Sequence, residues 1–202
     1  MLPLSIDTAT ASESFYVDDV AFRSGLVPEQ TPLQMAVAAA LGGFVPPDVA
    51  RPFSYCDLGC GDGSTAIAVA ATNPLADVVG IDFNPLHIAA GNEQIARLGL
   101  TNVRLFEASF AALEPLSSEF EQPFDLVACN GIYSWLEDQP RQGLITFLQR
   151  HLRPGGLFYV ETTTLPGMAA VPPLWHLIQT LVPAAGRSSR QRAEEGLDWL
   201  ER

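Results

Sequence analysis

The chain has 202 residues, enough for one domain with a sizeable core, and its 48% hydrophobic and 17% charged residues are typical of a globular protein. Acidic residues outnumber basic ones 23 to 11, and the formal net charge of -12 disfavours general binding to nucleic acid or to an anionic membrane surface. The 3 cysteines are too few for a disulfide framework and suit a reducing, cytoplasmic location. Cys56 and Cys60 are spaced like half of a metal site, but no second Cys or His pair accompanies them, so we expect no metal.

Residues 1–45 are predicted to form an N-terminal arm followed by a helix. Residues 1–30 have no clear periodicity and are expected to lie over the domain as an arm. A helix is predicted over Pro32–Leu41, because two glycines follow it directly. The N-terminus lacks a basic region followed by an apolar one, and no apolar run is long enough to cross a bilayer, so we expect neither a signal peptide nor a membrane span.

From residue 46 onward, short apolar segments alternate with helical ones. The predicted strands are Phe53–Leu58, Val78–Asp82, Val103–Phe106, Phe124–Cys129 and Leu157–Val160. The predicted helices are Ser64–Ala71, Pro85–Leu98, Gln142–Leu152 and Leu174–Leu181. This alternation predicts an α/β fold with a parallel sheet and helices on both faces.

We assign residues 46–185 to this α/β domain and residues 186–202 to the start of a further helix. Ala193, Leu197 and Leu200 are spaced for one face of a helix. The segment ends at a charged pair without a capping residue, so we expect this helix to be truncated.

The strongest chemical signal is the segment Asp57-Leu-Gly-Cys-Gly-Asp-Gly63, between the first predicted strand and a helix. Glycines at such a turn let the backbone approach a ligand closely and expose N–H groups. Asp82 ends the next strand, 23 residues after Gly59, where a carboxylate can accept both hydrogen bonds of a ribose diol. Together, the two features indicate a ribose-bearing cofactor at the strand ends.

The details of the turn favour S-adenosylmethionine over a dinucleotide. A dinucleotide motif has Gly or Ala at its sixth position, where this chain has Ser64, and its third glycine comes one residue later than Gly63. Asp57, two residues before the first glycine, is poorly placed beside a pyrophosphate but well placed near the ammonium of an amino acid. A nicotinamide-dependent oxidoreductase therefore remains only as an alternative.

These segments resemble the successive motifs of class I S-adenosylmethionine-dependent methyltransferases. They are Asp57–Gly63, Ile81-Asp82, Phe124-Asp-Leu-Val127 and Leu152-Arg-Pro-Gly-Gly156. More narrowly, the chain is similar to bacterial methyltransferases that carry a C-terminal methyltransferase regulatory domain, some of whose relatives are protein lysine methyltransferases. The further matching segments are Asp82–Ile88, Glu107–Phe110, Asn130–Trp135 and Leu165–Met168.

The resemblance implies a doubly wound, mainly parallel, Rossmann-like sheet of order 3-2-1-4-5, with helices on both faces and the cofactor at its carboxyl edge. The final antiparallel strand pair of the family has no candidate in this chain. The regulatory domain is likewise expected to be missing from it.

The resemblance also implies roles for individual residues. Gly59 and Gly61 would line the methionine part of the cofactor, and Asp57 would reach its amino group through water. Asp82 would hold the ribose hydroxyls. The adenine would be contacted by residues that follow the second and third strands, namely Phe83, Ala108 and Ser109. Ser109 could equally be a helix N-cap, and Asp82 could be the N-cap of the helix that follows it.

Asn130 and Tyr133 are the candidate catalytic residues. By resemblance, Asn130 would offer its carbonyl oxygen to the methionine ammonium and face the reacting methyl, while Tyr133 could instead be a core aromatic. Methyl transfer by in-line displacement needs alignment and exclusion of water rather than a dedicated base. Tyr133 and Glu161 are nevertheless the nearest candidates for a base.

The sequence leaves the methyl acceptor open. A protein lysine or a small amine is slightly favoured, because several acidic residues lie near the predicted strand ends and would attract a cation. They could also be a solvated surface of an acidic protein. Two further alternatives are a non-catalytic module that binds S-adenosylmethionine and an inactive fragment of a larger methyltransferase.

Overall fold

The computed structural model describes residues 25–113, 116, 119–120, 122–164, 166–167, 171–182 and 186–201. Residues 1–24 of the predicted arm lie outside this range. The described residues divide into two compact units, a larger one that ends at Pro173 and a smaller one that begins at Leu174. The candidate site lies in the larger unit, and the two units are described separately.

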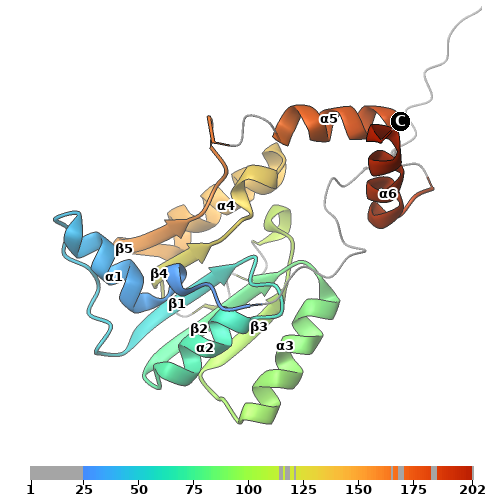
Figure 1. Ribbon diagram of the computed structural model, residues 1–202. Coiled ribbons are helices and arrows are strands. Elements are labelled where there is room, and N and C mark those ends of the chain that lie inside the picture. Colours follow the sequence, from blue (N-terminus) through green and yellow to red (C-terminus); the bar gives the residue numbers. More distant parts are fainter. Residues whose placement is uncertain are drawn as a thin grey trace, which may run out of the picture. The chain divides into compact units, whose positions relative to one another are not determined.

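The larger unit contains a five-stranded parallel sheet of order β3-β2-β1-β4-β5 (Figure 1). Its strands are β1 (Phe53–Leu58), β2 (Ala76–Asp82), β3 (Val103–Glu107), β4 (Phe124–Cys129) and β5 (Leu152–Val160). The predicted doubly wound α/β class and its strand order are confirmed. Within the described residues, no strand pairs antiparallel to this sheet.

Helices cover both faces of the sheet because the strand order reverses at β1. The principal helices are α1 (Pro32–Leu41), α2 (Ser64–Thr72), α3 (Pro85–Leu98) and α4 (Asp138–His151). Right-handed crossovers place α2 and α3 on one face and α4 on the other. Met35 of α1, Val69 of α2 and Ile88 of α3 join one buried core cluster. On the other face, Phe147 of α4 stacks on Phe124 with ring centroids 6.2 Å apart.

Local signals account for the bounds of α3, which match the prediction. Asn84 caps its first turn by accepting a hydrogen bond from the Leu86 amide at 2.9 Å. Pro85 takes the first helical position, where no N–H donor is needed. Gly99, with φ of 65°, ends the helix in the left-handed conformation.

The predicted bounds of α4 and β5 are wrong at their starts. The helix α4 begins at Asp138 rather than Gln142, because Pro140 lies in its first turn, where proline is tolerated. The strand β5 begins at Leu152 rather than Leu157, and the helix before it ends at His151. Leu152 pairs with Phe124 and Leu157 with Leu126, so the residues between them form an irregularity in the strand.

The smaller unit contains α6 (Ser189–Leu200), in the region where a further helix was predicted, and most of α5 (Val171–Leu181). A capping box between Ser188 and Gln191 starts α6. Gly196 lies so close to α5 that a Cβ atom there would be 2.8 Å from Ile178 Cγ2. No helix in the described part of the chain is long and apolar enough to cross a membrane.

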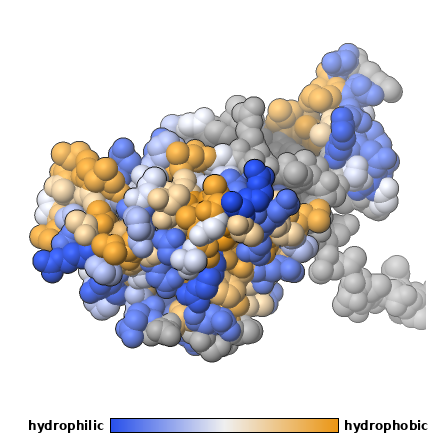
Figure 2. Space-filling view, turned by 90° about the horizontal axis from the view of Figure 1, so that it is seen from below, coloured by the Kyte–Doolittle hydropathy of each residue, from blue (hydrophilic) through white to orange (hydrophobic). Residues whose placement is uncertain are grey.

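Exposed apolar side chains gather on α1 and the residues that follow it. Figure 2 shows them as an orange area at the left of the view. The most exposed are Leu33, Leu41, Phe44 and Val45, at 65%, 86%, 71% and 91%. A contiguous apolar surface of this kind is typical of a place where another protein segment packs.

Three glycines surround the Leu105 side chain: Gly63 in the glycine turn, Gly80 in β2 and Gly91 in α3. A Cβ atom would lie 2.8 Å from Leu105 Cδ1 at Gly63 and 2.5 Å from Cδ2 at Gly80. At Gly91, in the middle of α3, a Cβ atom would lie 2.6 Å from the carbonyl oxygen of Asp62. The absence of side chains at these positions therefore lets the turn pack directly on α3.

We predict that Gly91→Ala lowers the free energy of unfolding by about 1–3 kcal/mol, because overpacking outweighs the better helix propensity of alanine. Urea denaturation followed by circular dichroism measures this change. Ala90→Ser, which adds one heavy atom on the exposed side of α3, is the control and should stay within about 0.5 kcal/mol of the wild type. Equal stability of Gly91→Ala and the control would contradict this account of the packing.

Candidate cofactor-binding site

The glycine turn leaves β1 and returns into α2. Gly59, Gly61 and Gly63 have φ of 77°, 56° and 74°, a conformation that residues with a side chain rarely adopt. The amides of Gly59 and Cys60 donate to the Ile81 carbonyl oxygen at 2.7 and 3.1 Å. The turn is therefore held at the carboxyl end of β2.

Asp82 joins this turn from the end of β2. Its Oδ2 atom accepts a hydrogen bond from the Gly61 amide at 3.0 Å, and its Oδ1 atom accepts one from the Asn84 amide at 2.9 Å. Each oxygen can accept a further hydrogen bond, as binding of a diol would require. The alternative of Asp82 as the N-cap of α3 is wrong, because Asn84 has that position.

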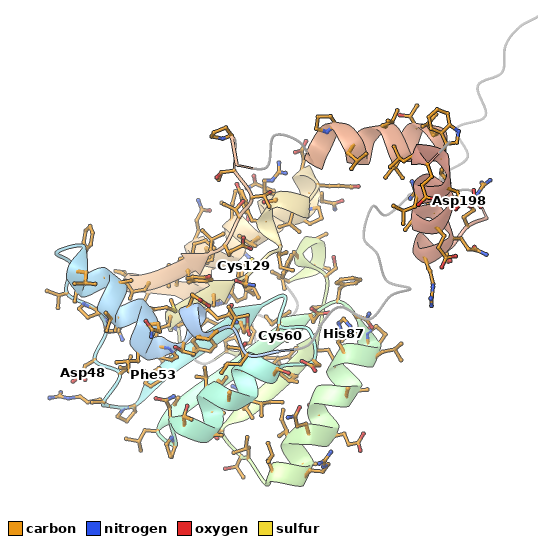
Figure 3. The ribbon with its side chains drawn as sticks, in the orientation of Figure 1. Asp48, Phe53, Cys60, His87, Cys129 and Asp198 are labelled. Atoms are coloured by element: carbon orange, nitrogen blue, oxygen red, sulfur yellow. The ribbon has the colours of Figure 1, made fainter. Side chains whose placement is uncertain are left out.

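His87 is a neighbour of Asp82 that sequence reasoning missed. Figure 3 shows Cys60 in the glycine turn and His87 near the start of α3, while Phe53 marks the opposite end of β1. His87 Nδ1 lies 3.5 Å from Asp82 Oδ1. The spacing of His87 from Asp82 matches no motif, so the sequence alone did not indicate this neighbour.

Asp57 is almost completely buried beneath the turn. The pKa of its carboxyl group is raised to about 7, first by burial and then by the nearby Asp82 carboxylate, while a hydrogen bond from Gln30 offsets part of the rise. Its charge near neutral pH therefore depends on the groups around it. A cation placed beside Asp57 would favour the ionised form.

The segment just before α1 contacts Asp57. Gln30 Nε2 donates to Asp57 Oδ2 at 3.2 Å. The Val27 amide donates to Thr65 Oγ1 in α2 at 3.0 Å. Sequence reasoning missed Gln30 as a site residue, since it lies 27 positions before Asp57.

The residues after β3 return to the end of β2. The Ala108 amide donates to the Asp82 carbonyl oxygen at 2.9 Å, so Ala108 lies beside Asp82. Ser109 Oγ accepts from the Ala111 amide at 3.3 Å and caps the short helix η2 (Phe110–Ala112), as its alternative interpretation predicted. Phe83 follows Asp82 directly and is half-buried.

The loop after β4 carries Asn130 and Tyr133. Asn130 Oδ1 accepts a hydrogen bond from the Tyr159 hydroxyl at 3.3 Å. Tyr133 begins the short helix η4 (Tyr133–Trp135), and the guanidinium carbon of Arg141 lies 5.7 Å from the centroid of its ring. The loop thus presents both predicted catalytic residues at the carboxyl edge of the sheet.

One side of the glycine turn is covered and the other is open. A Cβ atom at Gly59 would lie 2.7 Å from Cγ1 and Cδ1 of Ile132, so a ligand can approach Gly59 from this direction only if the Ile132 side chain moves. A Cβ atom at Gly61 would have no atom within 4 Å. The turn, the Asp82 carboxylate and the free space at Gly61 therefore fit a ribose-bearing ligand.

The cysteines near the turn lack the properties of reactive thiols. Burial, and to a smaller extent the Asp57 carboxylate, together raise the pKa of Cys129 to about 12. Burial also raises the pKa of Cys60 well above its usual value. Since the thiolate is the reactive form, both side chains act as small packing residues. The described residues contain no group of His, Cys, Asp and Glu that could hold a metal ion.

The fold and this edge of the sheet define the class of α/β domain that binds an adenosine-containing cofactor at the switch point of its strand order. The family model described as "Methyltransferase domain" matches residues 56–158. The chain belongs to this family. The predicted class, an S-adenosylmethionine-dependent methyltransferase domain, is thereby confirmed.

Known proteins resemble the chain over much of its length. An uncharacterized protein of Synechocystis sp. is 34% identical over 190 residues, which is 92% of this chain and 36% of that protein. Trans-aconitate 2-methyltransferase of Deinococcus radiodurans is 35% identical over 113 residues, which is 55% of this chain and 38% of that enzyme. The chain thus spans little more than a third of the length of these relatives.

A solved structure shares the fold. PKMT2 from Rickettsia typhi, in complex with AdoHcy, superimposes with a TM-score of 0.73 and 23% sequence identity. The match covers 89% of this chain and 34% of that one. It supports the strand order and the helical layers described above.

We predict that Asp57 makes the protein less stable as the pH rises. Because the folded-state pKa of about 7 exceeds the ordinary value of 3.8, the folded chain binds more protons than the unfolded chain between these values. Asp57→Asn should remove this contribution. As the pH rises from ~5 to ~8, the free energy of unfolding of Asp57→Asn should increase by on the order of 1–3 kcal/mol relative to that of the wild type.

Urea denaturation at both pH values measures this difference. Asp77→Asn, at the amino end of β2, removes an exposed carboxylate as the control. The account of Asp57 fails if Asp57→Asn and the control have the same stability difference between the two pH values.

Proposed function

We propose that this domain binds S-adenosylmethionine at the carboxyl edge of its sheet and transfers the methyl group to an amine. The bound cofactor would supply a methyl group activated by its sulfonium. The contact between the Asp82 carboxylate and the Gly61 amide is the observation that carries the proposal. It brings a group suited to a ribose diol next to a backbone turn that a ligand can approach.

The remaining predicted residues surround this contact. In the proposal, Asp82 holds the ribose hydroxyls, and Gly59 and Gly61 line the methionine part. Asp57 faces the amino group of the cofactor. The adenine would lie between the residues after β2 and β3, which are Phe83, Ala108 and Ser109.

Asn130 and Tyr133 would face the reacting centre from the loop after β4. Alignment of the acceptor with the methyl group and exclusion of water are the main tasks of the chain. Ile132, on the same loop, is suited to excluding water once a ligand is present. Glu161 lies nearby, since its Oε2 atom would be 3.5 Å from a Cβ atom at Gly131. It could accept the proton that an attacking amine loses.

The charge distribution supports a cationic acceptor, such as a protein lysine or a small amine. Exposed acids lie at the end of β3, just after β5 and near the start of α4, and these are Glu107, Glu161, Glu137 and Asp138. Three arginines lie at the amino ends of β1, β3 and β5, where each pairs with an acid, and these are Arg51, Arg104 and Arg153. Arg141, near the start of α4, pairs with Asp138 and leaves the other acids of this edge in excess. The field at the carboxyl edge should therefore attract cations.

A carboxylate acceptor is the second candidate, because the Deinococcus radiodurans relative is a trans-aconitate 2-methyltransferase. The acidic carboxyl edge disfavours it. We further propose that the domain acts in the cytoplasm without nucleic acid, together with a regulatory domain. The exposed apolar surface on α1 is suited to packing against such a domain.

Calorimetry with S-adenosylhomocysteine, and transfer of a labelled methyl group to a panel of acceptors, test the proposal. The panel should contain a lysine-rich peptide, a polyamine and trans-aconitate. Binding without any transfer would favour the non-catalytic module. Failure of the ligand to bind at millimolar concentration, or tighter binding of NAD, would overturn the proposal.

We predict that Asp82→Asn weakens S-adenosylhomocysteine binding by about 10- to 100-fold, since a charge-assisted hydrogen bond to the ribose would be lost. Calorimetry gives the affinity. Asp77→Asn, five positions earlier on the same strand and at its opposite end, is the matched control and should bind as the wild type does. Equal affinities for the two variants would exclude Asp82 from the ribose site.

A further inference from the structure

In the side-chain amide of Gln30, the nitrogen forms a hydrogen bond and the oxygen has no partner among the described residues. The side chain belongs to the short helix η1 (Pro28–Gln30) and is only 2% exposed. Its Nε2 atom donates to Asp57 Oδ2 at 3.2 Å. Its Oε1 atom is buried, with no hydrogen-bond partner in the described part of the chain. A buried acceptor without a partner is costly, and a ligand that donates a hydrogen bond to Oε1 would remove this cost.

The position of Gln30 is fixed from both sides. Before it, the Val27 amide donates to Thr65 Oγ1 at 3.0 Å and ties the segment to the first turn of α2. After it, Met35 of α1 is buried in the core cluster. Gln30 therefore has little freedom to turn its amide group elsewhere.

The groups near Gln30 Oε1 determine which kind of ligand group could bind there. The two ends of one amide are adjacent, so Oε1 shares the buried surroundings of the Asp57 carboxylate. A carboxylate or thioether would be repelled by these oxygen acceptors or would leave them without donors. A cationic donor satisfies both, and a hydrogen bond that involves an ion is stronger than a neutral one.

We propose that Gln30 is a binding residue for the amino-acid end of S-adenosylmethionine: its Nε2 atom positions the Asp57 carboxylate, and its Oε1 atom accepts a hydrogen bond from the ligand's ammonium group. This inference rests on the proposed function. It adds to the site a residue that precedes the glycine motif in the chain. It also gives the segment 25–31 a part in recognising the ligand.

A mutant cycle with three ligands tests the inference. The ligands are S-adenosylhomocysteine, its deamino analogue, which keeps the carboxylate but lacks the ammonium, and methylthioadenosine, which lacks both. Gln30→Met keeps a similar volume but has no amide. It should bind S-adenosylhomocysteine about tenfold or more weakly than the wild type, and the other two ligands within about twofold. Gln34→Met, an exposed change of the same kind on α1, should leave all three affinities unchanged.

Each other outcome overturns the inference. If Gln30→Met weakens all three ligands equally, Gln30 only supports the fold around Asp57. If it weakens S-adenosylhomocysteine and the deamino analogue but not methylthioadenosine, Gln30 recognises the carboxylate rather than the ammonium. Failure of the wild type to bind any of the ligands would instead remove the proposed function itself.

A second variant keeps the test valid if Gln30→Met does not fold. Gln30→Glu retains the shape and an oxygen acceptor for the ammonium. The preference of this variant for S-adenosylhomocysteine over the deamino analogue should equal or exceed the preference of the wild type. Because Asp57 loses the Nε2 donor in this variant, loss of that preference in a folded Gln30→Glu protein would contradict the proposal that an oxygen acceptor at position 30 is enough to hold the ammonium.

Discussion

The hydrogen bond from the Gly61 amide to the Asp82 carboxylate joins the ends of the two central strands, and the candidate site is arranged around it. Two further bonds, from Gly59 and Cys60 to the Ile81 carbonyl, hold the same turn. Parallel strands with their carboxyl ends at one edge of the sheet place the residues that follow them side by side. The Asp82 carboxylate therefore lies next to the backbone of the glycine turn. A ligand that replaced the Gly61 bond with its own hydroxyls would find Asp82 already in place.

The site also contains a second carboxylate, and its burial has a cost. Asp57 lies beneath the turn, where loss of water and the proximity of Asp82 both disfavour its charge. The Gln30 amide offsets part of this effect. A cationic group bound above Asp57 would offset more of it, so the buried acid is better explained by ligand binding than by stability.

Much of the fold can be predicted from local sequence signals, whereas several residues around the candidate site cannot. The bounds of β1, α3 and β4 match the prediction because proline, glycine and capping residues lie at or near their ends. The start of β5 was missed because it depends on pairing between Leu152 and Phe124, which no local pattern indicates. Gln30 was missed for a similar reason, since its partner Asp57 is distant in sequence. The place of Asp82 beside the glycine turn could be predicted, because its position at a strand end fixes where its carboxylate lies.

The loops that close the site are linked to one another, and this limits how a ligand can enter. Ile132 lies against Gly59, so this side chain must move before a ligand occupies that side of the turn. Two residues further on, Ser134 Oγ lies 2.6 Å from Thr162 Oγ1 and accepts a hydrogen bond from the Thr163 amide at 2.7 Å. The loops after β4 and β5 are thus joined, and a shift of Ile132 that moved its backbone would also displace the segment that carries Glu161. Cofactor entry and the shape of the acceptor side are therefore expected to change together, even though the glycine turn itself stays fixed.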